Sequence, residues 1–164
     1  MEVVKAPYVG SSVVRKDWID GNGHMNVGHY LSAFDDGSCV MFDELGLGWD
    51  YTAKGKGSIF IMSSSLDFLR ELVEGDSLQI ATWLITYDNS RTHVFQELFN
   101  SDKSYLAARA EFMFVHVSLK TRKVFDMPQN ALNRLAQIKS VHRPLVSSKF
   151  IGREISLQWK SING

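Results

Sequence analysis

With 164 residues, the chain is long enough for one domain with a hydrophobic core. Its 45% hydrophobic and 22% charged residues are ordinary for a globular protein, and 18 basic residues balance 18 acidic ones. A formal net charge of zero gives no overall field for nucleic acid or an anionic membrane, so an anionic ligand requires a local patch.

The N-terminal residues and the single cysteine bear on the cellular location of the protein and on metal binding. The sequence MEVVKAPYVG lacks the basic-then-apolar pattern of a signal peptide, and no run of about 18 apolar residues is present. We therefore expect a cytoplasmic protein with neither a membrane nor a nucleic acid partner. Cys39 has no second cysteine to pair with, and no Cys/His spacing is typical of zinc, so we expect no metal.

The N-terminal half predicts a strand, a loop and one long helix. A β-branched run at 8–16 predicts the strand, and turn formers at 17–25 predict the loop. Asn26 is a good N-cap, and glycines at 46 and 48 suit the end of a helix that runs to about residue 45. On a helical wheel, one face carries Val27, Tyr30, Leu31, Phe34, Ser38, Met41, Phe42 and Leu45, and the other carries Asp35, Asp36, Asp43 and Glu44. This pattern predicts a core helix.

After a connection at 46–57, the pattern changes to a period of two. It predicts four successive antiparallel strands, at 58–70, 78–87, 92–99 and 105–119, separated by turn residues. Small residues Ala107, Ala108 and Ala110 leave room for the long helix to cross the last strand. Pro128 suits the first turn of a short helix at 130–139, and the tail has a weak strand pattern. The sequence predicts an α+β domain at 1–140, with one helix across a curled antiparallel sheet, and a tail at 141–164 that packs on the domain or a neighbour.

Several of these residues also carry a family resemblance. The loop DGNGHMN at 20–26, with Tyr30 four residues later, resembles the loop motif of hot-dog-fold thioesterases of the 4-hydroxybenzoyl-CoA thioesterase type. Residues 69–76, with Leu-Arg before Glu-Gly-Asp, and 115–128, from Val-His-Val to Met-Pro, resemble further landmarks of that family. The similarity covers roughly 8–139. In the tail, Gly-Arg-Glu-Ile at 152–155 is similar to a branch found with carnitine catabolism, which includes betainyl-CoA thioesterases.

The resemblance implies a fold, an assembly and a substrate class. In that family an antiparallel sheet wraps around the helix, two subunits form one continuous sheet, and the active sites lie between the subunits at the helix N-terminus. It therefore implies a homodimer at least, and we expect a tetramer. An uncovered sheet edge would need such a partner in any case. The implied substrate is an acyl-CoA, with coenzyme A as part of the substrate and no separate cofactor.

Thioester hydrolysis needs a nucleophile or activated water and a group that polarises the carbonyl. Free backbone amides at a helix N-terminus supply the second, and the family match assigns that donor to the Val27 amide. Asp20 matches the family's catalytic carboxylate, as nucleophile or as general base. His24 is a competing base, or it orients the loop or contacts the substrate. Asn26 is expected to cap the helix and hold the loop, while Asp20 in a DGNG segment is also an ordinary turn former.

The other candidates are substrate-binding residues, each with a plainer alternative. They are Trp18, Gly23, Tyr30, Arg70, Arg122 and Lys123. Arg70 is expected at a pocket or phosphate contact, or in a surface ion pair with Glu71 or Glu74. Arg122 and Lys123 are expected at the phosphates of coenzyme A, or in a solvated turn. Trp18 and Trp49 would face the acyl group, where their rings would hold the trimethylammonium head of a betainyl group, or they are packing residues.

The leading interpretation is therefore an acyl-CoA thioesterase acting on a small acyl group, with Asp20 and the Val27 amide at its centre. A betainyl-CoA thioesterase of carnitine catabolism is the narrower alternative. A hot-dog hydratase acting on enoyl thioesters is a second possibility, although its usual Asp/His arrangement later in the chain is not found. A non-catalytic module that binds acyl thioesters is a third, and an intact Asp20 argues against it.

Overall fold

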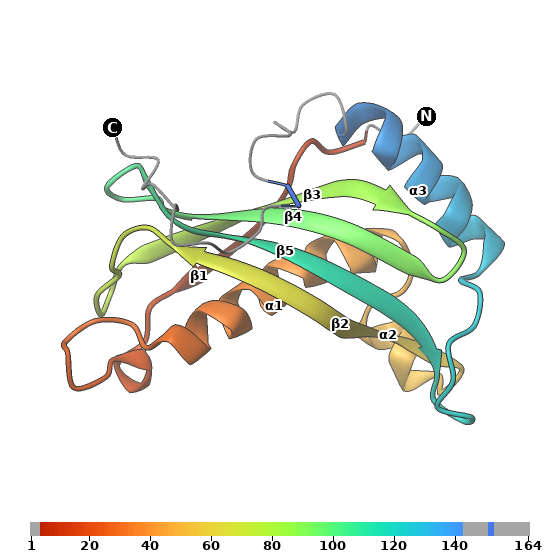
Figure 1. Ribbon diagram of the computed structural model, residues 1–164, viewed down its shortest axis with the longest axis horizontal. Helices are drawn as coiled ribbons and strands as arrows, with labels where there is room; N and C mark the ends of the chain where they lie inside the picture. The colour runs from red at the N-terminus through yellow and green to blue at the C-terminus, as the bar shows by residue number, and fades with distance from the viewer. Residues whose placement is uncertain (1–3, 143–150, 153–164) are drawn as a thin grey trace.

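The computed structural model describes residues 4–142 and 151–152. The predicted tail at 141–164 therefore lies mostly outside the described residues. One curved antiparallel sheet holds a long helix against its concave face, and two shorter helices lie at its margins (Figure 1). No helix in the described part of the chain is long and apolar enough to cross a membrane.

The predicted elements occur with small shifts at their ends. The order is β1 (Tyr8–Val13), a 3-10 turn (Lys16–Trp18), α1 (Val27–Glu44), α2 (Trp49–Ala53), β2 (Gly57–Phe68), β3 (Ser77–Tyr87), β4 (Arg91–Asn100), β5 (Tyr105–Ser118) and α3 (Gln129–His142). The α2 helix was missed because five residues are too few for helical periodicity to show. The α+β class and the long helix are confirmed.

The order of strands in the sheet differs from the order in the sequence. The sheet runs β1-β3-β4-β5-β2, so the four predicted antiparallel strands are present, but β2 does not lie beside β3, its neighbour in sequence. β2 pairs with β5 instead, from Gly57 opposite Ser118 to Phe68 opposite Ala108. The segment after β2 then crosses the end of the sheet, where the Leu69 amide donates to the Ala107 carbonyl at 2.9 Å. As a result, β2 is a twelve-residue edge strand.

The buried face of α1 is rotated slightly from the predicted one. It consists of Tyr30, Ala33, Phe34, Gly37, Ser38, Met41 and Phe42. The side chains of Val27 and Leu31, predicted to be buried, are 60% and 40% exposed. Because Val27 is the first residue of the helix, it extends past the covering sheet to the mouth of a cavity.

The tight contact between α1 and the sheet lies at two glycines rather than at the alanines of β5. A Cβ on Gly37 would lie 2.4 Å from Ile80 Cγ2, and a Cβ on Gly10 would lie 3.1 Å from the Gly37 Cα. In the same place the Thr82 hydroxyl donates to the Gly37 carbonyl at 3.2 Å. The helix backbone therefore rests directly on β1 and β3.

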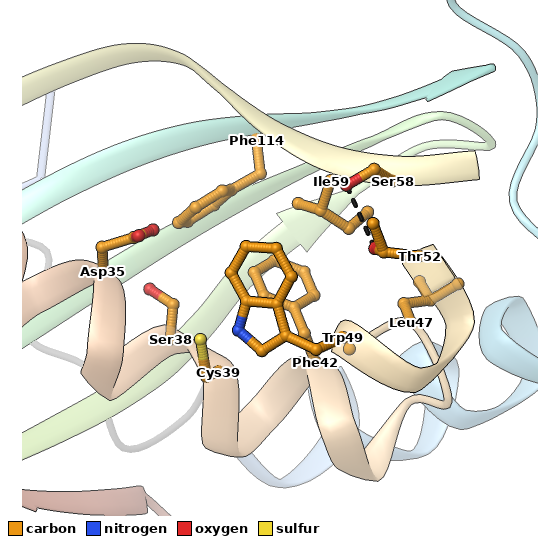
Figure 2. Close-up of a pocket in the computed structure, with 11 residues that line it drawn as sticks. Asp35, Ser38, Cys39, Phe42, Leu47, Trp49, Thr52, Ser58, Ile59 and Phe114 are labelled. Carbon is orange, nitrogen blue, oxygen red and sulfur yellow. Dashed lines mark hydrogen bonds between the residues drawn. The ribbon is translucent and has the colours of Figure 1, made fainter. Parts of the chain in front are cut away.

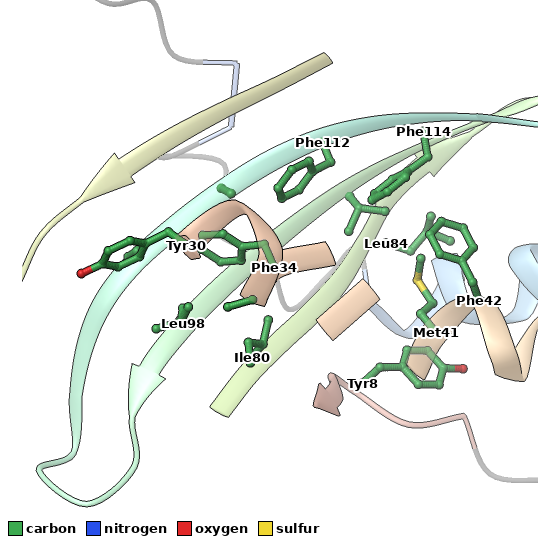
Figure 3. Close-up of a cluster of buried hydrophobic side chains, with 14 of the residues drawn as sticks. Tyr8, Tyr30, Phe34, Met41, Phe42, Ile80, Leu84, Leu98, Phe112 and Phe114 are labelled. Atoms are coloured by element: carbon green, nitrogen blue, oxygen red, sulfur yellow. The ribbon is translucent and has the colours of Figure 1, made fainter. Parts of the chain in front are cut away.

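From β5, aromatic rings span the space to the helix. Phe112 packs on Phe34 with ring centroids 5.9 Å apart, and Phe114 packs on Phe42 at 4.9 Å (Figure 3). These rings lie in a core cluster with Ile80, Leu84 and Leu98 of β3 and β4. Burying one such side chain contributes about 1.5–3 kcal/mol, so this cluster fixes where the N-terminus of α1 sits.

The last described helix, α3, lies along β3 and is joined to it by a buried histidine (Figure 1). His142 Nδ1 accepts the Leu84 amide at 3.0 Å, and the Nε2 atom lies within hydrogen-bond distance of the Lys5 carbonyl. Burial lowers the pKa of His142. The neutral ring therefore joins the N-terminal segment, α3 and the bulged end of β3.

Candidate active site

The loop before α1 is fixed at both of its sides by backbone hydrogen bonds. The Asn26 amide donates to the Trp18 carbonyl at 2.8 Å, and the Met25 amide donates to the Leu72 carbonyl at 2.7 Å. Within the loop, the Asp20 amide donates to the His24 carbonyl at 3.1 Å. The turn formers of DGNG thus build a rigid loop that presents residue 20 beside the helix start.

The Asp20 carboxylate is held by two donors. Its Oδ1 accepts the Asn22 amide at 2.8 Å, and its Oδ2 accepts Asn26 Nδ2 at 3.3 Å. The Asn26 side chain also accepts the Gly28 amide through Oδ1 at 3.0 Å, which makes Asn26 the predicted N-cap. One side chain therefore caps the helix and orients the carboxylate.

The Val27 amide is the first N–H of the helix, a position that has no partner within the helix. No hydrogen bond to this amide is found within residues 4–142 and 151–152. It sits at the positive end of the helix dipole, where developing negative charge is stabilised. Val27 and Asp20 line the same cavity.

This cavity, which we call the Asp20 cavity, has a volume of about 410 Å³. It lies between the loop, the start of α1 and the end of β2. Its walls are Asp20, Asn22, His24, Met25, Val27, Tyr30, Phe68, Leu69, Arg70 and Glu71. It brings together five of the residues predicted from sequence, and it adds Phe68, Leu69 and Glu71, which sequence reasoning missed.

Tyr30 serves both as a core residue and as a wall of the Asp20 cavity. It is 4% exposed, its ring packs edge-on against Phe68 at 5.1 Å, and its hydroxyl lies 3.5 Å from the Arg70 carbonyl. Burial, with a smaller effect of Tyr105, raises the pKa of Tyr30 to about 12. The phenol therefore stays neutral and keeps its proton at physiological pH.

His24 lines the cavity but is not paired with Asp20. Its Nδ1 lies 3.4 Å from the Met25 carbonyl, and among the described residues no hydrogen bond joins the imidazole to the Asp20 carboxylate. The two groups thus face one cavity without forming a dyad. The contact with ligand and the role of competing base stay predictions for His24.

Arg70 is an exposed cation at the cavity rim. Its guanidinium carbon lies 5.2 Å from the centroid of the Tyr105 ring. No ion pair joins Arg70 to Glu71 or Glu74 within the part of the chain that the structure describes. The predicted alternative of an ion pair with Glu71 or Glu74 is therefore not seen, and Arg70 is one of the walls of the Asp20 cavity.

Trp18 and Gly23 do not line the Asp20 cavity. Trp18 is 5% exposed, and its ring stacks on His29 at 5.3 Å while the Arg15 guanidinium covers it at 4.9 Å. The structure therefore gives Trp18 a packing role beneath the loop and does not bring it to the acyl side. Gly23 adopts φ +81°, a left-handed conformation, and donates to the Asp20 carbonyl, so it shapes the loop.

Arg122 and Lys123 lie in the exposed turn after β5, at the other end of the sheet. Ser118, at that end of β5, pairs with Gly57, whereas the Asp20 cavity begins at Phe68. Eleven residues of strand separate these two ends of β2, or about 36 Å. Within one chain the structure does not bring the turn to Asp20, so a role there depends on a second subunit.

A second, smaller cavity of about 90 Å³, which we call the Trp49 cavity, lies between α1, α2, β2 and β5 (Figure 2). Trp49, predicted to face the acyl group, lines this cavity and not the one beside Asp20. No group of three or more His, Cys, Asp or Glu side chains arranged to hold a metal occurs in the described residues.

Comparison with known proteins identifies similar sequences and folds. Residues 14–135 match the family model of the thioesterase-like superfamily. The chain is 28% identical over 144 residues to the betainyl-CoA thioesterase of Pseudomonas aeruginosa. This match covers 88% of this chain and 91% of that protein. It is 29% identical over 150 residues to an L-carnitine dehydrogenase/betainyl-CoA thioesterase of a Rhizobium species. That match covers 92% of this chain but only 30% of the longer relative.

A solved structure shows the same fold. A hypothetical protein of Staphylococcus aureus, determined in complex with CoA, superposes with a TM-score of 0.83 at 23% identity, over 96% of this chain and 99% of that one. Together with the family match, this confirms the predicted hot-dog fold.

Proposed function

Because this chain belongs to the thioesterase-like superfamily and its curated relatives are named thioesterases, we propose that it hydrolyses a small acyl-CoA thioester with Asp20 as nucleophile or general base. The observation that carries the proposal is that Asp20 and Val27, the first residue of α1, line the same cavity. Coenzyme A enters as part of the substrate, and the chemistry requires no metal or bound cofactor.

In the proposed reaction, Val27 and Asp20 supply the two groups that thioester cleavage needs. The carbonyl oxygen accepts the Val27 N–H, and negative charge that develops on it is stabilised by roughly 3 kcal/mol per such donor. Asp20 either attacks the carbonyl carbon or removes a proton from the water that attacks. In both routes the C–S bond breaks, the thiolate of CoA leaves and takes up a proton, and water supplies the oxygen of the free acid.

The edge strand β2 favours a dimer in which the sheet continues across two subunits. Four of its apolar side chains are exposed: Phe60 by 40%, Ile61 by 39%, Met62 by 58% and Phe68 by 47%. A twelve-residue edge strand of this kind needs a partner strand. A tetramer and a cytoplasmic location stay predictions.

Antiparallel pairing of two β2 strands about a two-fold axis completes the site. It places the Gly57 end of one strand beside the Phe68 end of the other, and so brings the partner's basic turn to the Asp20 cavity. Arg122 and Lys123 of the partner subunit would then face the phosphates of CoA, together with Arg70 at the cavity rim. Positive charges at this mouth fit an anionic carrier.

The names of the relatives favour one particular acyl group. Both of these curated relatives are named for betainyl-CoA thioesterase activity, and the match covers 91% of the length of one of them. We therefore propose betainyl-CoA as the substrate within the class of small acyl-CoA thioesters.

A substrate panel tests the proposal. Betainyl, short-chain, aromatic and long-chain acyl-CoA thioesters are compared by kcat/KM, with release of free CoA followed by a thiol reagent. Hydrolysis with a preference for betainyl-CoA is expected. A change in enoyl absorbance without thiol release would indicate a hydratase instead. Binding without turnover of any thioester would indicate a non-catalytic module.

A further inference from the structure

The Trp49 cavity has the chemistry of a site for a small organic cation. Its walls combine three aromatic residues, Phe42, Trp49 and Phe114, with one charged residue, Asp35. The remaining walls are Ser38, Cys39, Leu47, Gly48, Thr52, Ser58 and Ile59. Figure 2 shows the Trp49 ring between the carboxylate side and the Thr52–Ser58 side of the cavity. At about 90 Å³ the space suits a compact head group rather than a long chain.

Asp35 is a carboxylate without a cation. Within residues 4–142 and 151–152 it takes part in none of the ion pairs and none of the side-chain hydrogen bonds. Loss of surrounding water, and next the charge of Asp36, raise its pKa. A cation bound beside it would offset both effects, whereas an anionic or neutral head group would not.

Trp49 is the unusual apolar wall. It is 68% exposed, a large fraction for the largest apolar residue. As the first residue of α2, it lies directly over the cavity. An exposed aromatic side chain beside a carboxylate is a recognised arrangement for quaternary ammonium groups, because the ring face attracts a cation that has no N–H to donate.

The distance between Val27 and Asp35 along α1 shows whether the two cavities of one subunit can hold the same acyl group. Val27 and Asp35 are eight residues apart on the helix, or about 12 Å. In a betainyl group a single methylene separates the ammonium from the thioester carbonyl, so one chain cannot bind the carbonyl at Val27 and the ammonium at its own Asp35. The Trp49 cavity must then act on the substrate held by the other subunit.

Pairing of the β2 strands of two subunits would bring the Trp49 cavity of one subunit to the Asp20 cavity of the other. Ser58 and Ile59 of β2 line the Trp49 cavity, and Phe68 at the other end of β2 lines the Asp20 cavity. Antiparallel pairing of two β2 strands about a two-fold axis through their middle sets the Ser58 end of one beside the Phe68 end of the other. The two cavities then adjoin across the interface.

We propose that Asp35 and Trp49 of one subunit bind the quaternary ammonium of an acyl group whose thioester lies against Asp20 of the other subunit. The inference rests on the proposed function and deepens it, since it assigns the residues that select a cationic acyl group. Asp35 and Trp49 are substrate-binding residues here and take no part in bond cleavage.

The test compares betainyl-CoA with tert-butylacetyl-CoA, which has the same shape but carries carbon in place of the charged nitrogen. The measured quantity is the ratio of their kcat/KM values. Asp35→Asn is expected to lower this ratio about tenfold or more, and Trp49→Leu by roughly two- to thirtyfold, with hydrolysis of the neutral analogue nearly unchanged. Asp36→Asn, the adjacent exposed carboxylate outside the cavity, is the matched control and should leave the ratio unchanged.

Mixed dimers test the assignment across subunits. A dimer of one Asp20→Asn subunit and one Asp35→Asn subunit holds one intact composite site, so co-expression should restore selective betainyl-CoA hydrolysis that neither variant shows alone. No restoration would overturn the proposal. Equal loss of both substrates in Asp35→Asn and in Trp49→Leu would overturn it as well.

Failure of the proposed function gives a different result. If the wild-type protein hydrolyses neither of these thioesters nor any other member of the substrate panel, the thioesterase proposal fails. Calorimetric binding of glycine betaine to wild type and to Asp35→Asn then decides the cavity's role by itself. Binding that Asp35→Asn abolishes supports a cation site, and equal or absent binding in both refutes it.

Discussion

Asn26 offers a way to separate helix capping from orientation of the Asp20 carboxylate. Its Oδ1 accepts the Gly28 amide at 3.0 Å, while its Nδ2 donates to Asp20 at 3.3 Å. Serine at this position keeps an acceptor for the helix amides and removes the donor to Asp20. Alanine removes both. The pair Asn26→Ser and Asn26→Ala therefore divides the two functions of one side chain.

The magnitudes follow from the two contacts. Loss of an N-cap costs about 1 kcal/mol, so Asn26→Ala should lower the melting temperature by about 2–4 °C in a chain of 164 residues, and Asn26→Ser by much less. A hydrogen bond to a charged group contributes about 1.5–3 kcal/mol, and the length of 3.3 Å places this one at the low end. We therefore expect kcat to fall about tenfold in both variants.

The assay is thiol release at saturating acyl-CoA, combined with thermal unfolding of each variant. The KM should change little, because Asn26 is not a wall of the Asp20 cavity. Asn26→Ser with wild-type kcat would refute the orienting role and leave only the cap. Parallel losses of stability and kcat in Asn26→Ala, with neither in Asn26→Ser, would refute that role as well.

Three further predictions concern the scaffold. Gly37→Ala places a Cβ 2.4 Å from Ile80, so an overpacking cost of about 1–3 kcal/mol should exceed the gain in helix propensity of about 1 kcal/mol. Urea unfolding should show a net loss, and a variant as stable as wild type would contradict the tight crossing. Burial lowers the pKa of His142 in the folded state, so the stability from its neutral form is full above about pH 6.5 and is lost as the pH falls toward the folded-state value. His142→Gln should flatten the decline in stability between pH 7 and 5, and an unchanged slope would exclude this group as a cause. Met62→Lys on the β2 edge should yield monomers in analytical ultracentrifugation, whereas Val9→Lys on the β1 edge should not; a dimer in the first case would contradict pairing through β2.

The long helix and its cap were predictable from sequence because their signals are local. Asn26, the apolar period of α1 and the glycines after it act within a few residues of one another. The position of β2 was not predictable in this way. Its partner is β5, some fifty residues later, and a period of two says which side chains share a face but not which strand lies alongside.

The same contrast holds for the candidate site. Asp20, His24 and Val27 lie in one short motif, and the structure brings them to one cavity. Phe68 and Leu69 join them only because the chain crosses the end of the sheet after β2, a route that no local pattern reports. Leu69 lies in the segment 69–76, which resembles a motif of the family. The position of that motif at the end of a long predicted strand was the signal that could have assigned Leu69 to the site.

The two tryptophans show why residue type alone does not assign a role. Trp18 is adjacent to the loop in sequence but is buried beneath it, stacked on His29. Trp49 is far from the loop but is exposed over a cavity of its own, next to a carboxylate. Only the packing of α1 against the sheet distinguishes a core ring from a ring that is free to meet a ligand.

The central claim, that the Asp20 carboxylate performs the chemistry at the start of α1, is tested most directly by the hydrolysis rate of Asp20→Asn. Asparagine keeps the size of the side chain and an oxygen that accepts the Asn22 amide, so the melting temperature should stay within a few degrees of wild type. With acyl-CoA at saturation, we expect kcat for thiol release to fall by about a thousandfold or more, roughly 4 kcal/mol of barrier. A folded Asp20→Asn protein that retains more than a tenth of the wild-type kcat would contradict the claim.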